Sequence, residues 1–211
     1  MRTIMRLSKI VFVFMLLSVQ VYSQTNKDNP PYVVLLGGYY SSNYGLLKNI
    51  SNQNNVFLPQ IGFGFPFSPK MSLTGKVGYF SKRNIHSTIW LYGNGIQFDR
   101  SGSSNLYQQM FNVGTNYKIE FSSLTSGYFN LGLSNSIIRV DQIDGRGFSF
   151  SLKNYIIGFY TGITIEQEFA NLPISLLLDA DYNSMTENSK LPKGQCGGFN
   201  MSIGAKYIFH L

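Results

Sequence analysis

Hydrophobic and polar residues alternate with a period of two along most of the chain. The last segment is the clearest, because one face carries Phe199, Met201, Ile203, Ala205, Tyr207, Phe209 and Leu211. The same alternation is found at 57–65, 71–79, 107–121, 129–134, 155–166 and 174–183, and the segment 32–40 is apolar on both faces. A two-residue period predicts β-strands whose two faces meet different surroundings. The pattern therefore predicts eight strands, with the inward face of the first one undecided.

Short and long connections between these strands alternate along the chain. Short ones lie at 66–70, 122–127 and 170–173, and long ones at 41–55, 83–105, 141–147 and 186–198. This order is typical of an antiparallel up-and-down meander with all its long loops at one end. Residues 89–98 also alternate, which indicates that the strands on either side can extend into that connection. Pro59 cannot donate to a strand ladder, so we expect a bulge or a late strand start there.

Three features favour an apolar face on the outside. The apolar face is large and carries Phe and Tyr near the strand ends, as in an interfacial girdle. The charges within the strands fall almost wholly on the opposite face, together with many glycines. Eight strands also enclose an interior just wide enough for side chains to fill. The fold class predicted is thus all-β, an eight-stranded antiparallel up-and-down transmembrane β-barrel, and not a soluble barrel with an apolar interior.

The composition agrees with a lipid-facing β structure. The chain is 44% hydrophobic and 15% aromatic but only 13% charged, whereas soluble domains carry about a quarter charged residues. Disorder is excluded because disordered chains lose aromatic residues and gain charge. A helical membrane protein is excluded because the one long apolar run lies at the N-terminus.

The N-terminal segment has the three parts of a secretory signal. Arg2, Arg6 and Lys9 precede an apolar run at 10–19, and small residues follow near 21–23. We expect a signal peptide at 1–23 and a single β-barrel domain at 24–211. Without the signal, 14 basic residues face 10 acidic ones, and no basic cluster is dense enough for nucleic acid. The single Cys196 cannot form an internal disulfide, and the sequence assigns it no role.

Seven charged residues are expected to point into the lumen. They are Lys76, Lys118, Glu120, Glu166, Asp179, Asp181 and Lys206. Counted from the short-turn end, Lys206 and Asp179 lie at similar depth, and so do Lys118 and Glu166. We expect such side chains to pair and plug the interior, since unpaired charges in a confined space are costly. The alternative is a small water-filled pore lined by the same residues.

The C-terminus carries a short pattern of one polar residue, one glycine and two aromatic residues. These are Ser202, Gly204, Tyr207 and Phe209, followed by two further residues. With this pattern, the chain resembles the small eight-stranded outer-membrane β-barrels of the OmpA/OmpX kind (outer membrane protein β-barrel domain). The resemblance implies a Gram-negative outer membrane, insertion by the barrel-assembly machinery, short periplasmic turns and long extracellular loops. It implies no activity, because one fold hosts many functions.

The sequence offers little for catalysis, metal binding or a cofactor, and none is expected. His86 precedes Ser87, but adjacent residues on a strand point to opposite faces and cannot act as base and nucleophile. One cysteine and two distant histidines give no metal-ligand spacing. The predicted function is a structural or surface-interaction role, with loops that contact outer-membrane lipid, lipopolysaccharide or an external partner. The alternatives are a narrow porin-like channel and a lipid A-modifying enzyme.

The loops carry the functional signal that remains, a mixture of aromatic and basic residues. These are Tyr44, Trp90, Tyr92, Lys48, Lys82, Arg83, Arg100, Arg146, Lys190 and Lys193. Such a mixture suits sugars and the anionic groups of lipopolysaccharide, and it is equally expected of ordinary loops beside an anionic membrane.

Overall fold

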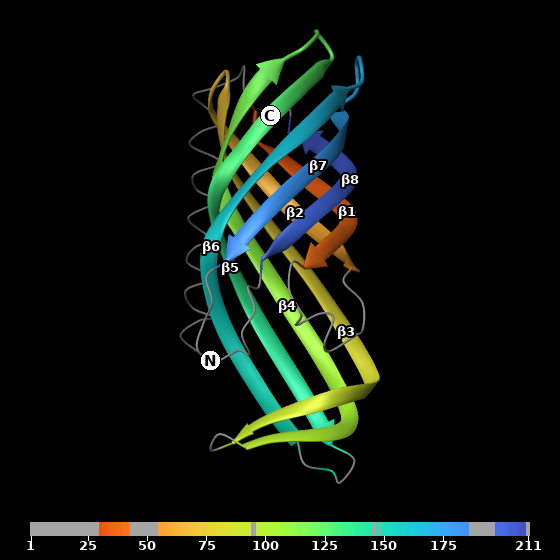
Figure 1. Cartoon of the computed structure of the whole chain (residues 1–211). Helices are drawn as coiled ribbons and strands as arrows, with labels where there is room; N and C mark the ends of the chain where they lie inside the picture. The colour runs from red at the N-terminus through yellow and green to blue at the C-terminus, as the bar shows by residue number, and fades with distance from the viewer. Residues whose placement is uncertain are drawn as a thin grey trace.

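The fold is a closed antiparallel barrel, seen in a computed structural model (Figure 1). The structure describes residues 30–42, 55–93, 96–144, 147, 149–185 and 197–209, with the side chains of 84–101, 144 and 150 left aside. The strands are β1 (Tyr32–Ser42), β2 (Asn55–Ser68), β3 (Met71–Gly93), β4 (Ile96–Glu120), β5 (Thr125–Asp144), β6 (Ser149–Glu168), β7 (Ile174–Met185) and β8 (Gly198–Ile208). Each strand pairs with the next, and β8 closes on β1. The predicted eight-stranded up-and-down barrel is confirmed. No helix in this part of the chain has the length and hydrophobicity needed to cross a bilayer.

The hydrogen-bonding register sets the width of the barrel. Followed once around the sheet, it leads from β1 back to β1 ten residues further on, through Tyr32, Gly64, Thr74, Gly114, Gly132, Tyr160, Asn183, Gly198 and Ser42. A shear of ten over eight strands corresponds to a strand tilt of about 40°. The enclosed space is narrow, so the inward side chains must fit against one another.

Alternation assigns every strand an inner and an outer face. Along β7, odd inward and even outward positions follow one another strictly, as shown by buried Asp179 and Asp181 beside exposed Leu178. Leu131 and Phe159 are 54% and 65% exposed on the outer surface. The undecided strand β1 turns Leu35 and Tyr39 outward. The predicted apolar outer face is confirmed.

Glycines on the inner face make room for aromatic rings. Gly114 and Gly132 lie directly opposite each other on β4 and β5. A Cβ atom on Gly132 would lie 2.6 Å from Cε1 of Tyr160 and 2.3 Å from the backbone oxygen of Val113. A side chain at Gly132 would therefore clash with the Tyr160 ring, which lies in the lumen beside this glycine.

Four strands continue far beyond the closed barrel. Pairing between β2 and β3 begins only at Gln60 and Gly78, although β3 runs on to Gly93. Pairing between β6 and β7 ends at Gly158 and Met185, although β6 begins at Ser149. Strands β3–β6 therefore form an extended wall, comprising 79–93, 96–109, 137–144 and 149–157, which Figure 1 shows running past the ends of β1 and β7. We call this end of the molecule the long-loop end and the opposite one the short-turn end.

Two expectations about connections were wrong. Residues 83–105 are mostly strand, because β3 and β4 pair up to Gly93 and Ile96. The alternation at 89–98 was the signal, and it predicted this extension correctly. Pro59 causes no bulge, since its ladder with Gly37 is regular. Proline is tolerated there because β2 pairs with β3 only from Gln60 onward.

Candidate functional site

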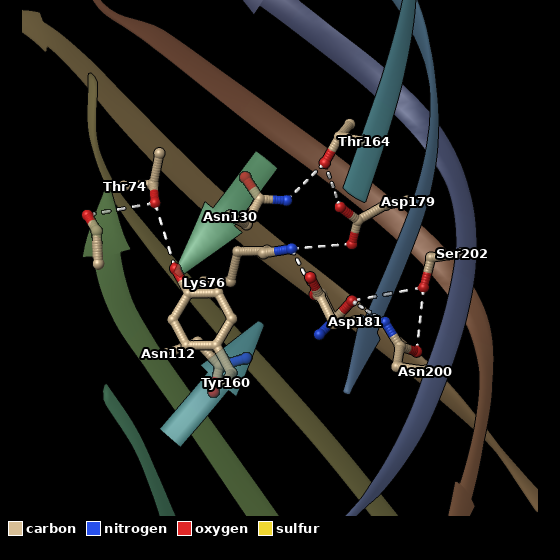
Figure 2. A network of polar contacts seen from close by, with 12 residues as sticks. Thr74, Lys76, Asn112, Asn130, Tyr160, Thr164, Asp179, Asp181, Asn200 and Ser202 are labelled. Atoms are coloured by element: carbon tan, nitrogen blue, oxygen red, sulfur yellow. Dashed lines mark hydrogen bonds and ion pairs between the residues drawn. The ribbon is translucent and has the colours of Figure 1, made fainter. Parts of the chain in front are cut away.

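The lumen contains a buried cluster of one lysine and two aspartates. Lys76 extends from β3 across the interior to β7, where its Nζ lies 2.8 Å from Oδ2 of Asp179 and 2.5 Å from Oδ2 of Asp181 (Figure 2). The side chains are 10%, 2% and 1% exposed, respectively. Because charge-assisted hydrogen bonds are strong when water is excluded, this cluster ties opposite sides of the barrel together.

Neutral side chains extend the Lys76 cluster to neighbouring strands. Thr164 on β6 donates its hydroxyl to Oδ1 of Asp179 at 2.6 Å. Asn130 on β5 donates its Nδ2 to the same threonine oxygen at 2.8 Å. Figure 2 shows both contacts beside Lys76. The second carboxylate oxygen of Asp179 is thus satisfied, as buried polar atoms require.

A second buried ion pair lies nearer the short-turn end. Nζ of Lys206 on β8 lies 2.8 Å from Oε2 of Glu166 on β6. The hydroxyl of Tyr128 donates to the same oxygen at 2.5 Å. Nζ of Lys206 also lies 4.5 Å from the ring centroid of Tyr32, within the range of a cation–π contact. This ammonium group is therefore enclosed by a carboxylate and an aromatic ring.

The last two of the seven predicted residues stand apart from the buried clusters. Nζ of Lys118 lies 3.3 Å from Oε1 of Glu120, whose side chain is 66% exposed. Both belong to the short-turn end of β4. Exposed pairs of this kind add little stability.

The inward charges do not pair as their expected depths in the barrel had indicated. The ladder places Lys206 of β8 opposite Ser175, which lies four residues from Asp179 along β7. The expectation that these two lie at similar depth was wrong. The actual partner of Lys206, Glu166, comes from β6, two strands away.

A small cavity separates the two buried clusters. Its volume is about 50 Å³, and Lys76, Asp179, Glu166 and Lys206 all line it. Such a space holds a few water molecules. An apolar wall that includes Val34 completes it.

An apolar cluster fills the lumen toward the long-loop end. Its buried members are Tyr40, Val56, Leu58, Phe80, Leu106, Met110, Ile138, Val140, Ile156 and Met185. These side chains resemble the core of a soluble protein, which excludes water by close packing. The lumen is thus polar in one part and apolar in the other.

Charged residues also gather on the outside of the extended wall. Asp141 on β5 accepts hydrogen bonds from Nε of Arg139 at 2.9 Å and from the Ser151 hydroxyl at 2.6 Å. Partial burial, the largest single influence, raises the pKa of Asp141, but the two hydrogen bonds and the charge of Arg139 together lower it below its usual value. The same hydrogen bond between Arg139 and Asp141 raises the pKa of Arg139. Both groups therefore stay ionised at neutral pH.

Comparisons with known proteins rest on structure alone. No protein-family model and no curated protein matches the sequence. The structure is similar to a major outer membrane protein from Thermus thermophilus, with a TM-score of 0.54 and 12% identity over 85% of this chain and 99% of that one. It is also similar to Neisserial surface protein A, with a TM-score of 0.48 and 14% identity over 85% of this chain and 96% of that one. Ail, the attachment invasion locus protein of Yersinia pestis, matches with a TM-score of 0.49 and 14% identity over 84% of this chain and 99% of that one.

This chain has the fold of the small eight-stranded outer-membrane β-barrels. The predicted resemblance is thereby confirmed at the level of fold. The fold itself assigns no activity, since function is carried by sites and not by folds.

Two features of this outer-membrane barrel fold were missed by sequence reasoning. The first is the apolar cluster, for which neighbouring apolar residues on the same strand were an available signal, as in Val56-Phe57-Leu58 or Ile137-Ile138. The second is the identity of the ion-pair partners. That required the register, because a side chain meets residues several strands away across a narrow barrel.

The C-terminal residues of the barrel divide between its two faces. Ser202 is buried, and its hydroxyl donates to Oδ1 of Asn200 at 3.1 Å. Tyr207 and Phe209 face outward, with ring centroids 5.3 Å apart in an edge-to-face arrangement. Gly204 lies in the ladder with β1. Their role as an assembly signal stays a prediction.

The candidates for chemistry lie largely outside the described side chains. The backbone at His86 belongs to β3, where the ladder shifts register between Asn84 and Ser87, and its side chain is not among those described. Cys196, His210 and the signal segment 1–23 also lie outside the described residues. Within the described ranges, no group of three or more His, Cys, Asp and Glu side chains could hold a metal ion.

Proposed function

We propose that the protein is an integral outer-membrane barrel with a structural or surface-interaction role. A signal peptide at 1–23 exports it, and the mature domain at 24–211 inserts into the membrane. The single observation that carries the proposal is the extended wall of β3–β6, which continues past the closed barrel. A sheet that leaves the membrane presents its polar outer surface to envelope lipid, lipopolysaccharide or an external partner. The relatives in structure are bacterial outer-membrane proteins, which supports this location.

The interior favours a closed barrel over a narrow porin-like channel. The buried ion pairs of Lys76 and Lys206 cross the lumen, and the apolar cluster fills it toward the long-loop end. Moving ions past these groups would separate buried opposite charges, which is costly. The space between the clusters, about 50 Å³, suits a few trapped waters.

Insertion is proposed to depend on the barrel-assembly machinery, which would read Ser202, Gly204, Tyr207 and Phe209 at the end of the last strand. The outward direction of the two aromatic rings supports this, because a receptor in the membrane can reach them. Nucleic acid, a cofactor and a metal have no place in the proposed function. Catalysis is likewise not proposed.

Planar-bilayer recordings test the closed lumen. The refolded mature barrel is expected to insert without discrete conductance steps, and insertion is verified separately by the band shift between heated and unheated samples in detergent. Regular steps from inserted protein would contradict the proposal and favour the porin-like alternative.

A deletion strain is expected to keep its lipid A mass profile unchanged; loss of one lipid A species would instead favour an enzyme.

A further inference from the structure

Two basic residues face each other on the outside of the extended wall. Arg139 on β5 and Lys153 on β6 are direct ladder partners, and both side chains are exposed. Like charges directly opposite on one face of a sheet repel each other. The arrangement is favourable when an anion lies between them.

Among the side chains that the structure describes, the neighbours of this pair carry little negative charge. Asp141 accepts a hydrogen bond from Arg139 only at Nε of the guanidinium group, and it also accepts one from the Ser151 hydroxyl. Nζ of Lys153 lies 5.2 Å from the Tyr155 ring centroid and makes no salt bridge with a described side chain. Arg83, exposed on the same outer face, stands opposite Asn105, which in turn pairs with Asp141. Three cations and one carboxylate thus lie within two neighbouring outward rows of the ladder.

The pair lies at the border between the apolar band and the polar surface. The next outward positions toward the short-turn end are Ile137 and Tyr155, which are ladder partners. Beyond them, Ile157 and Phe159 are 63% and 65% exposed and face hydrocarbon. An amphiphile on this face would place its acyl chain over the isoleucines and its head group at the cations, as at other membrane interfaces.

We propose that Arg139 and Lys153 bind a phosphate group of a phosphorylated glycolipid in the outer leaflet. The guanidinium Nη atoms and the ammonium group supply charged donors, and Arg83 supplies a further charge for a second phosphate. A glycolipid is favoured over a phospholipid because hydroxyl and amide side chains, at Ser151 and Asn105, stand in the next row and suit sugar hydroxyls. This inference deepens the proposed function and rests on membrane insertion.

Native mass spectrometry of the mature barrel in mild non-ionic detergent tests it. The ligands are bisphosphorylated lipid A, dephosphorylated lipid A, phosphatidylglycerol and the soluble polyanion inositol hexakisphosphate. The Arg139→Gln/Lys153→Gln variant removes two charges at the site. The matched control, Lys70→Gln/Lys118→Gln, removes two charges from the short-turn end.

Bisphosphorylated lipid A is expected to bind the double variant about thirtyfold more weakly than the wild type, and the control variant as well as the wild type. Dephosphorylated lipid A is expected to bind the wild-type barrel more weakly than bisphosphorylated lipid A does, by a similar factor. Equal binding to all variants, or an equal loss in the control, would overturn the proposal. Equal affinity for phosphatidylglycerol would overturn the glycolipid assignment, and equal affinity for the soluble polyanion would overturn membrane lipid as the source.

The two proposals fail separately. If the double variant binds lipid A as well as the wild type does, and the barrel is folded and does not conduct, the phosphate site is contradicted and the proposed function is left intact. Discrete conductance with unchanged lipid binding contradicts the closed lumen and leaves the phosphate site.

Discussion

Replacement of Lys76 by methionine is expected to lower the free energy of unfolding by about 3–5 kcal/mol. The ammonium group binds two carboxylates that are almost fully buried. Methionine fills a similar volume but leaves Asp179 and Asp181 as unpaired charges within the lumen. Equilibrium unfolding by urea in lipid vesicles, followed by the heat-dependent band shift, measures the loss.

The control for Lys76→Met is Lys118→Met. Its partner Glu120 is 66% exposed, so the change is expected to be within about 1 kcal/mol. Adding Asp179→Asn and Asp181→Asn to Lys76→Met should recover much of the stability, since no buried charge then lacks a partner. Equal stability of Lys76→Met and the wild type would show that the Lys76 cluster does not hold the barrel together.

Truncation of Leu58 to alanine is expected to destabilise the barrel by about 2–5 kcal/mol. Leu58 is fully buried in the apolar cluster, where the removed atoms leave a cavity in a tightly packed interior. The same truncation at lipid-facing Leu133, which is exposed, leaves no cavity because acyl chains refill the space. We expect it to lower the free energy of unfolding by about 1–2 kcal/mol, because only the transfer of the removed methyl groups from water to hydrocarbon is lost and no cavity cost is added.

The comparison of the two leucines is made in one lipid under one denaturant series. A loss at Leu133 as large as that at Leu58 would contradict the assignment of inner and outer faces. A negligible loss at Leu58 would show that the apolar cluster is loosely packed.

The outer surface was predictable because one simple rule holds on every strand. The outward positions of the closed barrel are largely apolar, so the period of two appears directly in segments such as 174–183 and 199–209. The strand count and the up-and-down order followed from the same alternation and from the spacing of the turns.

The interior was harder to predict because its contacts depend on the closure of the sheet. The contact of Lys76 with Asp179 and Asp181 could be predicted only from the shear of ten, because the shear decides which strands face each other across the lumen. The sequence placed all three residues in the lumen, but it could not pair them. The surface pair Arg139 and Lys153 was hidden for the same reason, since only the register sets the two residues opposite each other.

The rule also changes along the strands, which explains the missed apolar cluster. Toward the long-loop end, the outer face becomes polar, as at Arg139, while the inner face becomes a water-excluding core, as at Ile138. Between these zones, both faces are apolar, and alternation disappears from the sequence. A strand such as β5 therefore carries two successive patterns, and one template cannot describe both.

Fluorescence quenching of single tryptophans tests most directly whether the apolar face meets hydrocarbon. Leu131→Trp and Ile163→Trp are prepared in a Trp90→Phe background, and both positions are exposed on the outer surface. In vesicles, brominated acyl chains are expected to quench both tryptophans strongly, whereas aqueous iodide leaves them unaffected. Quenching by iodide with no response to brominated lipid would show that this face meets water and would contradict the barrel's orientation.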